Sequence, residues 1–393
     1  MVGASDRHLS YLRAIRTRVV ATYRRAMTSQ RIVDAVPRIA ALDILRGFAL
    51  GGILVVNITV MSNPAGLAAG PVTTVLTAFF FDKFYVLFSF LFGYSLTLQF
   101  RSAERDGVDA RLRTVRRCLA LMAIGLVHIA FFFSGDVLFG YGILGLILLA
   151  MNRIQPKTAI RCAAILYGSF VLALTAHGMI APPAEAVDQH AIADIRAGWL
   201  TAASYRWETF FERFDLFLVF GLLNVLPLFL LGFAAGKARL LETPDRYMSL
   251  LPKLQWIGFG IAAPFSLLTA IVDNPLLAGV TALLDLPLAA AYAATILRLA
   301  HTSPRLANTL GAAGKFAATN YICQSVIASV IFTGYGFALV GQLPNWQVLA
   351  IAAAIYGLQL IGSRLWARRH RYGPVEWALR RVTYGRREKW PRR

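Results

Sequence analysis

Long apolar stretches alternate with short polar segments along the whole chain. Since a helix rises 1.5 Å per residue, about 20 apolar residues span the roughly 30 Å hydrocarbon core of a bilayer. The pattern therefore predicts an all-α fold, a polytopic transmembrane bundle of about ten spans. These spans are expected at 39–61, 83–100, 117–134, 137–152, 158–180, 214–236, 250–272, 277–299, 311–333 and 346–367.

Basic residues fall into alternate gaps between these stretches, and most of the 40 Lys and Arg residues lie there. Short loops rich in Lys and Arg stay in the cytoplasm. The gaps at 62–72, 273–276 and 334–346 contain neither residue, and 181–213 carries several acids, so these are expected outside. Both termini are then cytoplasmic. The basic segments are 1–38, 101–117, 153–161, 237–253, 298–315 and 364–393.

The basic pattern divides the chain into three parts. Residues 1–38 form an N-terminal segment in which 9–27 predicts a basic amphipathic helix on the inner leaflet. A mitochondrial presequence has a similar composition. Residues 39–367 form one transmembrane domain. Residues 368–393 predict a second interfacial helix, which starts after Pro374.

Composition supports a membrane protein, because 57% of the residues are hydrophobic and only 15% are charged. A net charge of +20 suggests nucleic acid in a soluble protein. Here the positive-inside rule and anionic inner-leaflet lipid account for that charge, so no nucleic-acid partner is expected. The three cysteines lack metal-like spacing, and no metal site is expected.

The first span carries three polar residues on one helical face, Asp43, Arg46 and Asn57. Asp43 and Arg46 are three residues apart and close enough to pair. Asn57 lies about 16 Å further along the helix axis than Arg46. The pair either locks the inner end of a bundle, or the three residues line a cavity. Neighbouring glycines at 47, 51 and 52 allow close helix packing.

The third span carries His128, and Asp136 follows eight residues later. A continuous helix would separate them by about 12 Å, so they contact only if the break at Ser134-Gly135 folds back. A buried histidine is either a hydrogen-bonded packing residue or a proton acceptor for catalysis. The span after this break, 137–152, is the shortest and is expected to be tilted or partly re-entrant.

Three further polar residues enter predicted spans. Lys83 begins the second span beside an aspartate at the outer surface, where snorkelling is the simplest explanation. Asn320 and Gln324 lie one helical turn apart in the ninth span. Side-chain amides of this kind either join transmembrane helices or line a cavity.

Five segments resemble a known family. They are RIAALDILRGFALGGILVVNI (38–58), KFYVLFSFLFGYSL (83–96), GLVHIAFFFSGDVLFGYGILGL (125–146), GKFAATNYICQS (314–325) and YGPVEWALRRVTYGR (372–386). The chain is identified by them as a member of the YeiB-like family of bacterial inner-membrane proteins. This family is grouped with the transmembrane acyltransferases, which include heparan-alpha-glucosaminide N-acetyltransferase.

The resemblance implies a multi-pass protein of the bacterial inner membrane that transfers an acyl group from cytoplasmic acyl-CoA. The acceptor at or across the membrane is not indicated. Asp43, Arg46, Gly47 and Asn57 match the first-span pattern of these acyltransferases. One departure is clear, since their catalytic histidine follows soon after the Asn, and the stretch after Asn57 contains none.

Three functions remain open on this basis. For an acyltransferase, His128, Asp136 and Asn57 are the candidate catalytic residues, and His128 would be the general base. The candidate cavity-lining residues are Asp43, Arg46, Lys83, Asn320 and Gln324. A transporter would use the buried Asp, Arg and His as substrate or proton sites. A non-catalytic membrane protein is the third interpretation.

Overall fold

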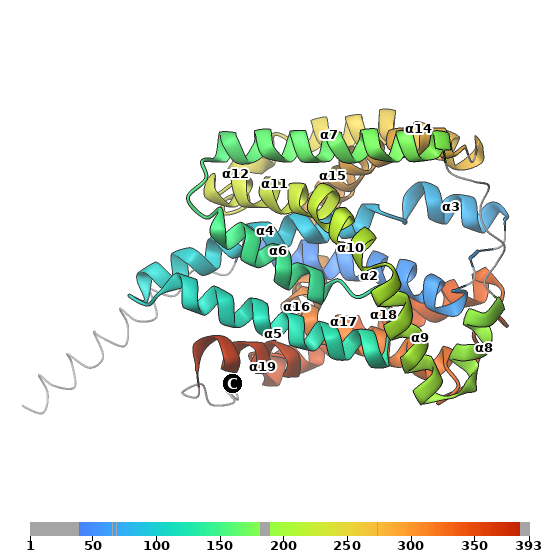
Figure 1. Cartoon of the computed structure of the whole chain (residues 1–393). Helices are drawn as coiled ribbons and strands as arrows, with labels where there is room; N and C mark the ends of the chain where they lie inside the picture. Colours follow the sequence, from blue (N-terminus) through green and yellow to red (C-terminus); the bar gives the residue numbers. More distant parts are fainter. Residues whose placement is uncertain (1–38, 65, 68, 181–188, 273, 386–393) are drawn as a thin grey trace, which may run out of the picture. The chain divides into compact units, whose positions relative to one another are not determined.

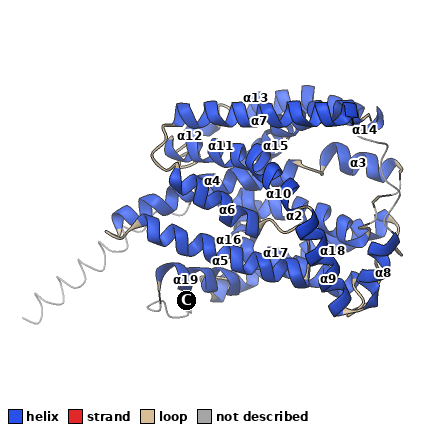
Figure 2. Ribbon diagram, viewed as in Figure 1, coloured by secondary structure: helices blue, strands red, loops and turns tan. Residues whose placement is uncertain are grey.

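The computed structural model describes residues 39–64, 66–67, 69–180, 189–272 and 274–385. The amphipathic helix expected at 9–27 lies outside these residues. The regular elements of the described part are all helices (Figure 2), in agreement with the predicted all-α class. The described residues from Ala40 onward cluster as one compact unit, and the following description concerns that unit.

Eight segments of the described chain are long and apolar enough to cross a membrane. Several of them contain a break or a short π- or 3₁₀-helical turn. They are α2 (Ala40–Ser62), α3–α4 (Pro71–Phe79 and Lys83–Arg105), α5 (Ala110–Phe131), α7 (Pro156–Ile180), α10–η1–α11 (Phe214–Phe220, Gly221–Val225 and Leu226–Lys237), α13–η2–α14 (Leu251–Gln255, Trp256–Ala262 and Ala263–Val272), η3–α15 (Pro275–Leu277 and Ala278–Thr302) and α18 (Asn345–Arg369).

The other two predicted spans are apolar helices that are too short. Helix α6 (Leu138–Ala150) has 13 residues and α17 (Ala317–Phe332) has 16. At 1.5 Å per residue they reach only about 20 and 24 Å. The expected number of ten is therefore corrected to eight candidate spans in the described part. The span expected at 311–333 is divided at Phe316, between α16 (Pro304–Lys315) and α17.

The remaining helices lie between these segments or after the last of them. Helices α8 (Gln189–Ala197) and α9 (Trp199–Glu212) follow α7, α12 (Pro244–Tyr247) follows α11, and α19 (Pro374–Tyr384) follows α18. Helix α19 begins at Pro374 itself, slightly earlier than the start after Pro374 that the sequence predicts. Figure 1 shows the α4–α5 turn, α12 and α19 at one end of the bundle, and α3 and α8 at the other. We call the first of these the basic end, because its segments contain Arg105, Arg111, Arg246 and Arg380.

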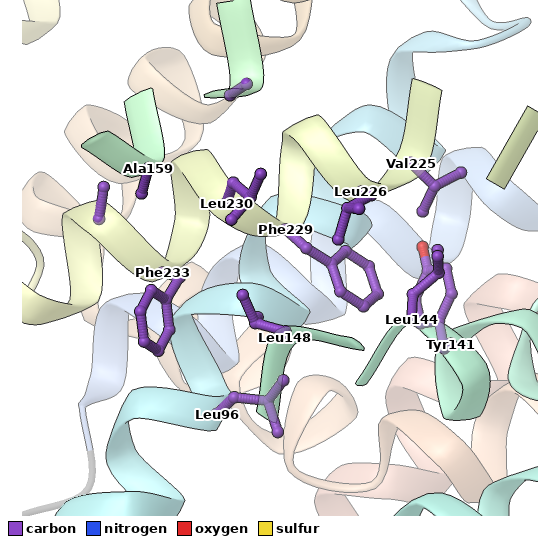
Figure 3. Packing of buried hydrophobic residues seen from close by; sticks show 12 residues of the cluster. Leu96, Tyr141, Leu144, Leu148, Ala159, Val225, Leu226, Phe229, Leu230 and Phe233 are labelled. Carbon is purple, nitrogen blue, oxygen red and sulfur yellow. The ribbon is translucent and has the colours of Figure 1, made fainter. Parts of the chain in front are cut away.

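One hydrophobic core joins α4, α6, α7 and α11 (Figure 3). Phe229 and Phe233 of α11 are fully buried in it, with Leu96 of α4 and Leu148 of α6. Lipid tails are as apolar as these side chains, so close van der Waals packing holds such a core together rather than exclusion of water.

Helix α2 lies at the centre of a second group of helices, with α4, α16, α17 and α18 around it. A methyl group on Gly47 would collide with the Leu310 carbonyl of α16. Gly51 and Gly52 lie against the rings of Tyr356 and Phe84. The close packing predicted for these glycines is therefore present, and it fixes the position of the Asp43–Arg46 turn.

Candidate active site

Helix α5 ends three residues after His128, and the chain then turns back into α6. The His128 carbonyl accepts hydrogen bonds from the amides of Phe132 and Phe133, both at 2.9 Å, which closes the last turn of α5. Asp136 lies just before α6, and its Oδ2 accepts from the Phe139 amide at 2.7 Å. An acidic side chain here is stabilised by the free amides and the dipole at the N-terminus of a helix.

The fold-back brings His128 and Asp136 into contact. His128 Nδ1 lies 3.0 Å from Asp136 Oδ1. Gly125 makes this possible, because a methyl group there would lie 2.7 Å from Asp136 Oδ2. The separation expected for a continuous helix does not apply, since the chain reverses at Ser134-Gly135.

The His128–Asp136 pair is deeply buried. His128 is 1% exposed and Asp136 is 3% exposed. The Tyr321 ring of α17 lies 5.2 Å from the His128 ring, measured between centroids. His128 Nε2 is buried and has no hydrogen-bond partner among the described residues. A carboxylate beside Nδ1 favours the tautomer with its proton on that nitrogen, which leaves Nε2 as a proton acceptor.

Asp43 and Arg46 form the ion pair that their spacing predicts. Arg46 Nη1 lies 3.2 Å from Asp43 Oδ1, and Nη2 donates a hydrogen bond to Ser95 Oγ of α4. Asp43 is buried, whereas the Arg46 side chain keeps 25% of its surface exposed. The guanidinium is thus anchored to two helices and still accessible.

Asn57 lies on the same helix as this pair but makes no contact with it. The residue is half-buried, and its side chain has no hydrogen bond or ion pair among the described residues. The catalytic role predicted for Asn57 remains an expectation.

Lys83 does not reach the surface, so the expectation of snorkelling is wrong. Its side chain is 1% exposed, and Nζ lies 2.8 Å from Asp285 Oδ1 of α15. Nζ also donates a hydrogen bond to the Thr77 carbonyl of α3, at 3.0 Å. The side chain turns inward because a carboxylate and a free helix-terminal carbonyl both lie within its reach.

Asn320 and Gln324 join α17 to α18. Asn320 Nδ2 donates to Ser363 Oγ at 3.0 Å, and Gln324 Nε2 donates to Gln359 Oε1 at 2.7 Å. Gln359 Nε2 donates in turn to the Asn320 carbonyl at 3.0 Å. This is the helix-joining role that the sequence left open for these amides.

Helix α19 connects the two helices that carry His128 and Tyr321. Glu376 of α19 accepts hydrogen bonds from the amides of Ala318 and Thr319, at 2.7 and 3.1 Å, and from Thr319 Oγ1 at 2.5 Å. At the C-terminal end of α19, the Tyr384 ring packs under the Arg113 guanidinium of α5, at 4.3 Å. Helix α19 thus ties the starts of α5 and α17 together.

Glu376 also explains why a helix begins at residue 317. The first amides of a helix need acceptors, and a carboxylate satisfies several of them. Burial raises the pKa of the Glu376 carboxyl above its ordinary value of 4.5, and hydrogen bonds from Thr319 and Ala318 offset part of this rise.

Sequence reasoning missed three residues of these sites, namely Asp285, Tyr321 and Ser95. Asp285 had a usable signal, because an aspartate in the middle of an apolar segment requires a partner. Tyr321 and Ser95 carried no such signal, since hydroxyl groups are common in membrane helices.

Comparisons with known proteins show two family matches that together cover residues 38–386. A model described as "Heparan-alpha-glucosaminide N-acetyltransferase, catalytic" matches residues 38–263. A model described as "Protein of unknown function (DUF418)" matches residues 235–386. The first match includes Asp43, His128 and Asp136, and the second includes Tyr321 and Glu376.

Two bacterial relatives are similar over most of their length. The chain is 31% identical over 387 residues to "Uncharacterized protein YxaH" of Bacillus subtilis, which covers 88% of this chain and 94% of the relative. It is 27% identical over 392 residues to "Uncharacterized protein YeiB" of Escherichia coli, which covers 88% of this chain and 96% of the relative.

Proposed function

This chain belongs to the family of the heparan-alpha-glucosaminide N-acetyltransferase catalytic region and its DUF418 relatives, and we propose that it is an integral-membrane acyltransferase. The donor is cytoplasmic acyl-CoA, and the acceptor is a hydroxyl or amine at or across the membrane. The multi-pass fold associates with the lipid bilayer. Its bacterial relatives support a place in the inner membrane.

The observation that carries this proposal is the contact between His128 and Asp136. General-base catalysis requires a group that accepts a proton near neutral pH, and histidine is the side chain that most often does so. A carboxylate 3.0 Å from Nδ1 orients the ring and stabilises the imidazolium that forms. The free Nε2 is the atom that takes the proton.

The proposed reaction requires only the acceptor, the acyl-CoA thioester and His128. The acceptor oxygen or nitrogen attacks the thioester carbonyl carbon, and its proton moves to His128 Nε2. The new bond to carbon forms as the carbon–sulfur bond breaks. The imidazolium then returns the proton to the departing thiolate, so free CoA leaves and the histidine is neutral again.

The proposed orientation places the basic end in the cytoplasm. Arginines at that end then meet both the anionic inner leaflet and the CoA phosphates. Arg46 fits this role because its guanidinium is partly exposed while Asp43 and Ser95 fix its position. Lys83, Asn320 and Gln324 support the helices in this scheme and do not take part in the reaction.

Transport of a small molecule is the second candidate function. The Lys83–Asp285 ion pair favours it, because the pair lies at the break between α3 and α4. Discontinuous helices with buried charges form substrate and ion sites in many transporters.

Purified protein in lipid nanodiscs, incubated with acetyl-CoA or palmitoyl-CoA, distinguishes the two functions. Release of free CoA, detected by its thiol, is the result expected for an acyltransferase. Uptake of solutes into proteoliposomes without any dependence on CoA, together with no binding of acyl-CoA, would instead establish a transporter.

A further inference from the structure

A groove lies between α6 and the α10–η1–α11 segment. It has a volume of about 340 Å³, within the range of ligand sites. Its walls are almost entirely apolar, and Ile143, Leu144, Phe217 and Val225 are among the lining residues. Its polar lining is confined to Ser134, Asp136 and Tyr141. The turn at 134–136 is therefore part of the groove wall as well as of the His128–Asp136 pair.

Local backbone structure creates this groove. Residues 221–225 form a single π-helical turn, and such turns bulge from a helix and are frequent at functional sites. A methyl group on Gly221 would meet no atom closer than the Leu144 methyl groups at 3.9 Å. The missing side chain at Gly221 thus leaves open space between α6 and η1.

The flank of the groove is a surface for hydrocarbon. Leu216, Val219 and Leu222, on the same segment as its wall, are 64%, 51% and 40% exposed. They belong to a candidate membrane span, Phe214–Lys237. Apolar side chains that are exposed along a membrane span are in contact with lipid. The groove is therefore continuous with the bilayer interior rather than with water.

We propose that this groove holds one aliphatic chain of a membrane lipid, whose polar end lies at the 134–136 turn. The apolar walls match the chain, and the polar residues confined to Ser134, Asp136 and Tyr141 match a head group with hydrogen-bond donors. The proposal that a lipid tail binds here rests on the groove alone and does not depend on the proposed reaction.

If the protein is an acyltransferase, as proposed above, the lipid bound in this groove is the acyl acceptor. This second step rests on the proposed function. The hydroxyl or amine of the lipid head attacks the thioester of acyl-CoA, and His128 takes the proton. A carbon–oxygen or carbon–nitrogen bond forms as the carbon–sulfur bond breaks, and CoA leaves as the free thiol. Asp136, through its position in both the groove wall and the pair, brings the lipid head next to the base.

Photo-cross-linking tests the binding. The probe is phosphatidylethanolamine with a diazirine in the middle of one acyl chain, incorporated into nanodiscs with the full-length protein. Peptides from 138–147 and 217–225 are expected to carry more label than 164–172, a control segment on α7. Gly221→Leu fills the groove and should lower the labelling of its peptides about tenfold, which corresponds to about 1.4 kcal/mol of binding free energy.

The matched control is Gly168→Leu on α7, where a methyl group meets no atom within 4 Å. This variant should leave the labelling of groove peptides unchanged, and both variants should remain monodisperse with the unfolding temperature of the wild type. Equal labelling of groove and control segments, unaffected by Gly221→Leu, would mean that only bulk lipid is present and would overturn the proposal.

Release of CoA separates this inference from the proposed function. A lipid acceptor predicts release from palmitoyl-CoA in phosphatidylethanolamine nanodiscs, little release in lipid-free detergent, and a loss with Gly221→Leu. Release that is equal in detergent and unaffected by this variant would refute a lipid acceptor, although the protein would still be an acyltransferase. Groove-specific labelling without any release would refute the acyltransferase and retain the lipid site.

Discussion

Lys83 and Asp285, 202 positions apart in the chain, form a fully buried ion pair, with 2.8 Å between Nζ and Oδ1. Lys83 is the first residue of α4, and its Nζ also binds the Thr77 carbonyl near the end of α3. The ammonium group therefore satisfies a carbonyl at the break in the span and neutralises the carboxylate of α15. One side chain connects three helical segments.

Removing one member of this pair should destabilise the fold. Lys83→Met leaves the Asp285 carboxylate buried without its partner, which typically costs about 3–5 kcal/mol. The double variant Lys83→Met/Asp285→Leu removes both charges and should recover most of that loss. Unfolding midpoints in mixed micelles, measured for both single variants and the double variant, give the coupling. If the stability loss of the double variant equals the sum of the losses of the two single variants, the two charges do not depend on one another.

Asp136→Asn should separate the structural role of Asp136 from its chemical role. The amide oxygen still accepts from the Phe139 amide, so α6 and the fold are expected to remain. The negative charge beside His128 Nδ1 is lost, and turnover should fall by about 10²-fold or more, the lower range for general-base catalysis. CoA release at saturating acyl-CoA, compared with the unfolding temperature, checks this. Equal losses of stability and turnover would assign Asp136 to structure alone.

Glu376 predicts a specific dependence of stability on pH. Since its pKa is raised by burial, the folded protein binds the proton more tightly than the unfolded chain. Its contribution to the free energy of unfolding is fully present below the ordinary value of 4.5 and is lost as the pH rises through the raised value. The stability of the wild type relative to Glu376→Gln should therefore fall with rising pH.

The measurement is the unfolding midpoint of the wild type and of Glu376→Gln at pH values from below 4.5 upward. Glu104→Gln on α4 is the exposed control. A stability difference that increases with pH would contradict burial as the dominant influence on Glu376. Glu376→Gln also tests α19 as a link between α5 and α17. Weaker packing of α19 in this variant should increase proteolysis after Tyr384.

The orientation of the bundle is open to a direct test. A single cysteine at Val108, in the α4–α5 turn, should react with a membrane-impermeant maleimide only in inverted vesicles. A cysteine at Leu200, in α9, should react in intact cells. Variants for this purpose replace Cys118, Cys162 and Cys323 by alanine. Labelling of position 108 from outside would reverse the proposed orientation.

The long helices can be predicted from the length of the apolar stretches, whereas contacts between different helices cannot. Asp43 and Arg46 were predictable as a pair because they share one helix and lie one turn apart. His128 and Asp136 were not, because their contact depends on how the chain reverses at Ser134-Gly135. For Asp285, the sequence indicates that a partner is required but not which residue it is, because Lys83 lies in a distant segment. Helix α17 is short because Glu376 fixes its first residue, and no local pattern in 311–333 contains that information.

His128→Gln provides the most direct measurement of the proposed chemistry. Glutamine keeps a hydrogen-bonding side chain in the buried site but accepts no proton near neutral pH. The rate of CoA release should fall by about 10²–10⁴-fold, the usual contribution of a general base, while acyl-CoA binding and the unfolding temperature stay close to those of the wild type. A His128→Gln variant that releases CoA at the wild-type rate would contradict the assignment and leave His128 as a packing residue.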